Sequence, residues 1–592
     1  MKNAAEADRW GIEPGYHDVF GVWHEIPART RERLEAAISR NRTEPVGESD
    51  TGPARRAYQC RERKVWGIAM QLYALRSARN WGHGDFEDLA ALIRIVAPMG
   101  CGAIGLNPLH ALFLDRPENA SPYSPNSRIF LNPLYIAVDT VPDCPDAAEL
   151  GRKEILEELR AADVVGYPAV AALKRMALEV GYARFRKGAD ARRQHDFDVF
   201  RAEAGEPLLW FGAFEALRHR FGGAPWRQWP SVWRTPSRSA IVDLWNAATA
   251  EGDPEADPAY HAYLQWLAAR QLQRCQEMAQ RCGMAIGLFI DLAVGVDPAG
   301  ADAWYGQDDM LMDVSIGAPP DEYNRAGQNW GLTTYNPQAL IAVRGAPLRQ
   351  MLDATMRYAG AIRIDHVLGL QRLYLIPYEV SANEGAYVRY PFETLLDVIV
   401  DESQRRRCVV IGEDLGTVPD GFREILKRRG IWSFQVMLFE REHDGGFRSP
   451  GSYQTEALAT FSTHDLPTFA GWMSGHDLRT KRRLNIDPGE GDDARLVSRR
   501  RLAEAVRTVA GGERFDGAAA FLAQTPARLV MVALEDVLGM EDQVNIPGTV
   551  NEHPNWRRRP PVAVEALTQH DELRRIAAIF AQAGRSSDSA KT

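Results

Sequence analysis

The stretch Ala361-Ile362-Arg363-Ile364-Asp365-His366-Val367 decides how the chain folds. Its apolar residues alternate with Arg363 and Asp365, which is the two-residue period of a β-strand. A turn follows at Leu368-Gly369, so a carboxylate, an arginine and a histidine stand where a strand leaves the core. In α/β folds, sites are built at the carboxyl ends of strands. The pattern predicts that Asp365 is a nucleophile whose partners come from elsewhere in the chain.

Other segments have the apolar pattern of strands, and helical segments separate most of them. These strands are predicted at 65–72, 102–107, 286–292, 409–414, 434–438, 458–465 and 529–534. With the strand that ends at Asp365, eight strands alternating with helices predict an α/β fold, a (β/α)8 TIM barrel with large inserted helical subdomains. The competing fold is an open doubly wound sheet, but no Gly-rich phosphate fingerprint follows the first strand.

The domain boundaries follow from breaks in this rhythm. Residues 1–60 are polar, and a helix at 28–38 is expected to pack on the barrel. The catalytic barrel is expected over 61–583, and the tail 584–592 is expected to be disordered. Within the barrel, 110–284 is interpreted as an inserted subdomain. Its predicted helices cover 152–162, 168–186, 208–221 and 258–282.

Composition excludes several function classes. The 592 residues are 45% hydrophobic and 25% charged, which is typical of a soluble globular protein. The net charge of −9 gives no overall attraction to nucleic acid or to an anionic membrane, so neither is expected as a partner. The short basic runs at 405–407 and 557–559 are interpreted as solvated faces.

The cysteines and the N-terminus indicate a cytoplasmic protein. Six cysteines occur without a C-x-x-C pair, which favours reduced thiols. The first residues lack the apolar segment of a secretion signal, and no apolar run approaches the length of a membrane span. We therefore expect a cytoplasmic location.

Three of the later strands end in acids: Asp365, Glu413 and Asp465. In a barrel these strand ends meet at one mouth, and two carboxylates about 5–5.5 Å apart are what retaining glycoside chemistry requires. Arg363 is expected to lower the pKa of Asp365 and keep it charged. The apolar residues before Glu413 are expected to raise its pKa for acid duty. Asp465, next to His464, is expected to bind sugar hydroxyls and stabilise an oxocarbenium-like transition state.

Each acid also has a purely structural interpretation. Arg363 and Asp365 form an ion pair in that view, Glu413 binds a surface arginine, and Asp465 caps a helix. The convergence of three acids favours a site. Asp291 also ends a strand, and it either contacts a sugar ring or holds Arg363; the supporting role is favoured.

Motifs for other chemistries are absent from the sequence. It contains no G-x-x-x-x-G-K-[ST], H-E-x-x-H or G-x-S-x-G segment. Zinc-ligand spacing and a calcium-binding loop are also missing. We therefore predict no cofactor and no required metal.

Several segments resemble the 4-α-glucanotransferases of glycoside hydrolase family 77, also called amylomaltases or disproportionating enzymes. The segments are A-I-R-I-D-H at 361–366, I-G-E-D-L-G-T-V-P at 411–419, S-T-H-D-L-P at 462–467, and further matches at 121–123, 287–304, 317–331, 545–549 and 555–557. The resemblance covers roughly residues 60–580. It implies a catalytic barrel, an α-1,4-glucan donor and a double displacement.

By this resemblance, Asp365 is the nucleophile, Glu413 the acid/base and Asp465 the transition-state stabiliser. The residues that accompany them around the substrate are Arg363, His366, His464, Asp291, Tyr123 and Trp330. The rings of Tyr123 and Trp330 either stack on sugars or pack in the core. The implied partners are malto-oligosaccharides and α-1,4-glucans as donors and acceptors, and glucose as an acceptor. A retaining α-1,4-glucan hydrolase and a catalytically dead glucan-binding barrel are the alternatives.

Overall fold

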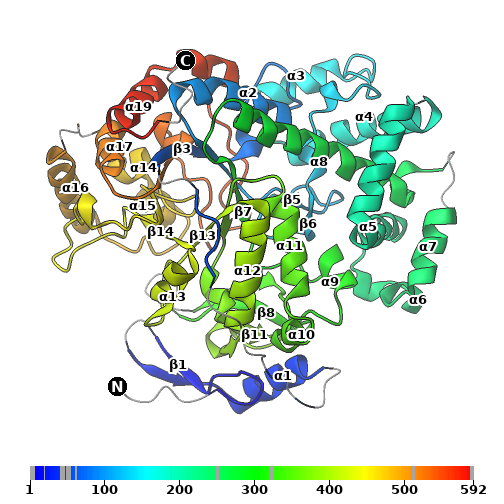
Figure 1. Cartoon of the computed structure of the whole chain (residues 1–592), viewed down its shortest axis with the longest axis horizontal. Coiled ribbons are helices and arrows are strands. Elements are labelled where there is room, and N and C mark those ends of the chain that lie inside the picture. The colour runs from blue at the N-terminus through cyan, green and yellow to red at the C-terminus, as the bar shows by residue number, and fades with distance from the viewer. Residues whose placement is uncertain are drawn as a thin grey trace.

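The fold is built around a closed barrel of parallel strands in the order β10-β13-β14-β15-β16-β3-β4-β7 (Figure 1). The computed structural model describes residues 7–18, 21–40, 44, 47, 55–60, 63–188, 190–247, 252–320, 326–509, 512 and 514–586. The barrel strands are β3 (Val65–Met70), β4 (Ala103–Leu106), β7 (Gly287–Leu292), β10 (Ala361–Ile364), β13 (Val409–Gly412), β14 (Trp432–Val436), β15 (Ala457–Thr460) and β16 (Leu529–Ala533). The predicted (β/α)8 barrel is therefore confirmed.

Some strands differ from their predicted ranges. β15 ends at Thr460 rather than at 465, so Asp465 lies in the loop that follows this strand. β14 begins at Trp432 rather than at 434, because Trp432 and Ser433 pair with Ile411 and Gly412 of β13. The apolar run alone does not reveal this pairing, since Ser433 interrupts it.

Helices cover the outside of the barrel in all but one connection (Figure 1). They are α2 (Phe86–Val96), α8 (Pro258–Arg281), α11 (Ala346–Met356), α12 (Phe392–Arg406), α13 (Phe422–Arg429), α17 (Phe515–Ala523) and α19 (Asp571–Gln582). The exception is the stretch 437–456 between β14 and β15, which the structure describes throughout and which contains only the 3-10 turn η9 (Pro450–Ser452).

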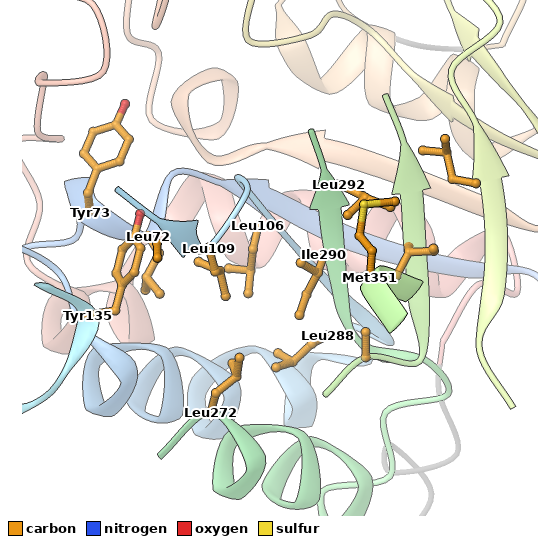
Figure 2. Packing of buried hydrophobic residues seen from close by; sticks show 14 of the residues in the cluster. Leu72, Tyr73, Leu106, Leu109, Tyr135, Leu272, Leu288, Ile290, Leu292 and Met351 are labelled. Carbon is orange, nitrogen blue, oxygen red and sulfur yellow. The ribbon is translucent and has the colours of Figure 1, made fainter. Parts of the chain in front are cut away.

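The strands bury both faces, as parallel strands do. Figure 2 shows the outer face of β7, where Leu288, Ile290 and Leu292 lie between Leu272 of α8 and Met351 of α11. The inner faces of the strands form a separate apolar cluster inside the barrel.

The same alternation orients the stretch around Asp365. Ile362 and Ile364 belong to the outer cluster, whereas Ala361 belongs to the inner one. Because side chains alternate along a strand, Arg363 and Asp365 point inward, at the carboxyl end of the barrel.

The segment expected to be an insertion is mainly helical. Its elements are β5 (His110–Ala111), β6 (Ser127–Leu131), α3 (Lys153–Ala161), α4 (Tyr167–Gly188), α5 (Ala191–Arg220), α6 (Ser231–Arg234) and α7 (Arg238–Ala247). α5 starts well before the predicted 208, and Gly205, with φ of 56°, interrupts it. α8 packs on α5 of this subdomain and also on α2 and β7, so it joins the subdomain to the barrel.

The N-terminal segment packs on a second sheet. That antiparallel sheet has the order β12-β11-β8-β9 and consists of β8 (Val314–Ala318), β9 (Gln328–Leu332), β11 (Arg372–Pro377) and β12 (Ala386–Arg389). The predicted helix is confirmed as α1 (Ala28–Ile38), which packs on β11. An unpredicted hairpin, β1 (Gly15–His17) with β2 (Trp23–Glu25), precedes it. The segment reaches the barrel itself near Ala57, whose N–H donates to Arg429 O at 2.7 Å.

The predicted disorder from 584 onward is wrong for residues 584–586. Arg585 is fully buried and donates to the carbonyls of Ala523 and Ala527, both at 2.8 Å. Its guanidinium satisfies carbonyls of the turn between α17 and β16, which orders this part of the tail. Residues 587–592 lie outside the described part of the chain.

Six further α-helices of the described chain lie in the connections between these elements. They are α9 (Ala301–Tyr305), α10 (Pro337–Ala342), α14 (Phe469–Ser474), α15 (His476–Arg483), α16 (Asp492–Arg507) and α18 (Leu534–Val537). Within the ranges given above, none of the helices combines the length and the apolar character needed to cross a membrane.

Candidate active site

Arg363 lies at the centre of the barrel mouth and joins carboxylates from three strands. Its register partner on β7 is Asp291, whose two oxygens lie 2.7 and 2.8 Å from Nη1. The same nitrogen lies 3.0 Å from Asp365 Oδ1, and Nη2 lies 3.8 Å from Glu413 Oε2. The predicted convergence of strand ends is confirmed for these residues, and Asp291 supports Arg363 as expected.

Asp365 has a different acidity from the one predicted. Burial raises its pKa to about 6, although Arg363 acts in the opposite direction. The nearby carboxylates of Asp291 and Glu413 add to the rise. The predicted lowering is therefore wrong, because desolvation of a side chain only 18% exposed outweighs one arginine. A pKa of about 6 still leaves most Asp365 carboxyl groups ionised at pH 7.

Glu413 follows β13 and is held by backbone N–H groups on both oxygens. His366 N donates to Oε2 and Leu415 N donates to Oε1, each at 2.9 Å. Burial raises the pKa of Glu413, against the opposing effects of Arg363 and of these two hydrogen bonds. The expected rise is confirmed, and it suits a group that must carry a proton.

Asp465 has the opposite environment. Burial alone would raise its pKa, but His464 and Asn545 hold it below the usual value. His464 Nε2 lies 3.3 Å from Asp465 Oδ2, and Asn545 Nδ2 donates to Oδ1 at 2.6 Å. Asp465 in turn outweighs burial and raises the pKa of His464. Asp465 is thus kept charged while Glu413 is biased toward its protonated form.

The two predicted aromatic residues both lie at this mouth. Tyr123 donates from its hydroxyl to Asp291 Oδ2 at 2.5 Å, and its ring stacks on His464 with centroids 4.9 Å apart. The ring of Trp330, on β9, contacts the ring of His366 edge to face, with centroids 5.4 Å apart. The structure therefore brings together all the site residues predicted from the sequence.

Some residues at the mouth were missed. Asn545 lies in a segment that resembles the family, but it was given no role. Gln543 donates to the carbonyls of Asp465 and Asn545 at 2.8 and 2.6 Å and so ties two loops together. Phe439 lies just beyond β14 and is 45% exposed. Its position directly after a predicted barrel strand was the signal that would have marked it.

A cavity of about 850 Å³, counted to its open mouth, lies beside these groups. Its lining includes Tyr123, Asp291, Arg363, His464 and Glu535. Burial raises the pKa of Glu535 to about 7. A concave site with a few polar groups and perturbed acids is typical of a small-molecule site. Among the described residues, no group of three or more His, Cys, Asp or Glu side chains is arranged to hold a metal ion.

Comparison with known proteins agrees with this geometry. The family model described as 4-alpha-glucanotransferase matches residues 70–563. The 4-alpha-glucanotransferase of Mycobacterium tuberculosis is 37% identical over 524 residues, which cover 84% of this chain and 71% of that protein. The Haemophilus influenzae 4-alpha-glucanotransferase is 36% identical over 537 residues, with 84% and 75% covered. The crystal structure of amylomaltase from Corynebacterium glutamicum superposes with a TM-score of 0.82 at 27% identity, covering 97% of this chain and 98% of that one. The chain therefore belongs to the 4-alpha-glucanotransferases of glycoside hydrolase family 77.

Proposed function

We propose that Asp365, Glu413 and Asp465 carry the glucan transfer of this 4-alpha-glucanotransferase. The observation that supports it best is the single guanidinium of Arg363, which lies 3.0 Å from Asp365 and 3.8 Å from Glu413. Two carboxylates bridged in this way are compatible with the separation of about 5–5.5 Å that retaining enzymes use. The raised pKa of Glu413 suits its proton-carrying role, and the lowered pKa of Asp465 suits a charged one.

In the first step, Glu413 donates a proton to the glycosidic oxygen while a carboxylate oxygen of Asp365 attacks the anomeric carbon. The bond to the leaving sugar breaks, and the reducing-end fragment departs with the proton. A covalent glycosyl ester on Asp365 remains. Asp465, kept ionised by His464 and Asn545, stabilises the positive charge that develops on the sugar ring.

In the second step, the 4-hydroxyl of an acceptor enters and Glu413 removes its proton. The hydroxyl oxygen attacks the anomeric carbon, Asp365 leaves as a carboxylate, and an α-1,4 bond forms with retention. Transfer exceeds hydrolysis when the acceptor side holds sugar better than it holds water.

The substrates are α-glucans, and we propose malto-oligosaccharides as donors with glucose or another glucan as acceptor. Tyr123, Trp330 and the exposed Phe439 supply rings that stack on the apolar faces of sugars. Phe439 follows β14, the strand next to β13 and Glu413, which favours a place on the acceptor side. We also propose a reducing cytoplasmic location, which the buried free thiols of Cys101, Cys275 and Cys408 support.

The test is incubation of the purified, metal-free protein with maltotriose, with chromatography of the products over time. Glucose together with maltotetraose and maltopentaose is the expected result. Glucose and maltose alone would replace transfer with the retaining hydrolase. No change would favour a catalytically dead glucan-binding barrel.

A further inference from the structure

His366 has a strained backbone next to the proposed nucleophile. Its φ is 48° and its ψ is 59°, in the left-handed region. For a residue with a side chain this conformation is disfavoured, because Cβ comes close to the carbonyl oxygen. Such strain persists only where the surrounding structure imposes it, and it clusters at functional sites.

The surroundings of His366 show what imposes the strain. Glu413 N donates to Ile364 O at 3.0 Å, and Val367 N donates to Glu413 O at 3.1 Å. These two bonds continue the ladder between β10 and β13, with Asp365 and His366 placed between them. The chain thus bulges past one residue of the neighbouring strand, a device known to re-aim side chains near active sites. The left-handed turn directs His366 N–H at Glu413 Oε2, 2.9 Å away.

Gly412 allows residues 366–367 to pass close to the end of β13. A Cβ atom there would lie 2.9 Å from each of two methyl carbons of Val367. Val367 is fully buried, so it has little room to move aside. The glycine before Glu413 is therefore what lets residues 366–367 pass directly over the end of β13.

We propose that the backbone N–H of His366 is a positioning group for Glu413. It fixes the orientation of the carboxylate in the barrel mouth and favours its ionised form, independently of the imidazole. The inference rests on the proposed role of Glu413 as acid/base. A group that donates a proton in one step and removes one in the next needs an intermediate acidity, and this N–H offsets part of the effect of burial.

Other charges face Glu413, and they act on it through their side chains rather than through the N–H of His366. Arg363 lies 3.8 Å away, Asp365 ends the same strand as Arg363, and Asp414 is the next residue. Asp414 is paired with Arg423 at 2.8 Å and accepts from the hydroxyl of Ser433. A change confined to the backbone of residue 366 therefore isolates the hydrogen bond.

The test compares His366→Gly, His366→Ala and His366→Val, which all lack the imidazole. Glycine adopts the left-handed conformation freely, alanine does so at a cost, and the β-branched valine resists it most. The measurement is the pH profile of kcat/KM for transfer from maltotriose. We expect the basic limb of His366→Gly to match that of the wild type. The limb moves upward through His366→Ala to a shift of roughly one pH unit in His366→Val, because losing the N–H raises the pKa of Glu413.

A second variant and a control make the result specific. Gly412→Ala, which keeps His366 but displaces Val367, is expected to move the basic limb in the same direction, and it serves if His366→Val fails to fold. Arg407 has a similar φ of 53° at the end of α12, so Arg407→Val introduces comparable strain elsewhere and is expected to leave the limb in place. The inference would be overturned if the basic limb of the pH profile lay at the same pH in His366→Gly and His366→Val. It would also be overturned if Arg407→Val moved this limb as far as His366→Val does.

One readout needs no turnover. The carboxyl ¹³C signal of Glu413, identified by its absence from Glu413→Gln, titrates in the wild type and in each variant. A wild type that makes no transfer products defeats the proposed function and leaves this titration as the test of the positioning role. An upward shift of the Glu413 titration in His366→Val but not in His366→Gly supports that role, and identical titrations refute it.

Discussion

Replacing Asp365 with asparagine is expected to abolish turnover and, at neutral pH, to stabilise the protein. The pKa of Asp365 is about 6 in the folded chain, against about 3.9 for an ordinary aspartate. Folded protein therefore binds this proton more tightly than unfolded chain, so stability falls as pH rises from about 4 to about 6. About 2 pKa units at about 1.4 kcal/mol each amount to ~3 kcal/mol at pH 7. Asparagine has the same shape and carries no charge, so Asp365→Asn escapes this cost.

The assay is urea unfolding of the wild type and of Asp365→Asn at pH 7 and at pH 4. The variant is expected to have a higher free energy of unfolding at pH 7, by up to ~3 kcal/mol, and nearly the same value at pH 4. Asp420→Asn, at an exposed position, is the control and is expected to change neither value. The reasoning fails if Asp365→Asn is no more stable than the wild type at pH 7. It also fails if the gain is the same at both pH values, since ionisation is then not its cause.

Four further results are expected. Arg363→Gln moves the acidic limb of the pH profile of kcat/KM to higher pH, because removing the cation that opposes burial raises the pKa of Asp365 further. Arg363→Lys moves the limb less, and an unmoved limb in Arg363→Gln would contradict this account of Asp365. Phe439→Ala raises the share of glucose released by hydrolysis, measured against total maltotriose consumed, and an unchanged ratio removes the ring from the acceptor side. Arg585→Met lowers the free energy of unfolding by about 2–4 kcal/mol, because carbonyls at Ala523 and Ala527 lose their donor, while kcat stays unchanged. Treatment with EDTA leaves the transfer rate unaltered, and inactivation that added metal reverses would show a metal requirement.

The candidate site was largely predictable because its residues follow strands. Arg363 lies on β10, Asp365 directly follows β10, and Glu413 directly follows β13. The barrel topology alone requires such positions to meet. Asp465 lies beyond the end of β15 and needed the same inference. Gln543 was missed because a loop residue has no periodic pattern, and its neighbours depend on how the loop folds back.

The acidities were only partly predictable. Apolar neighbours in the sequence correctly indicated the raised pKa of Glu413, since burial is the larger effect there. For Asp365, the nearby Arg363 in the sequence predicted a lowered pKa, whereas the pKa is raised in the structure. The net effect depends on desolvation and on Asp291 and Glu413, which the fold brings within range from other strands.

The sequence by itself determined the eight strands, the barrel and the residues that converge at its mouth. Each strand is recognisable from its own apolar pattern, and parallel strands in a barrel place their carboxyl ends at the same mouth. Only the tertiary structure decided that α8 joins the insertion to the barrel, that Arg585 is buried and that the His366 N–H reaches Glu413. Each of these facts rests on a contact between segments distant in the chain or on a backbone turn imposed by such contacts. Periodicity carries no information about these contacts, since it records which face of an element is buried and not what covers it.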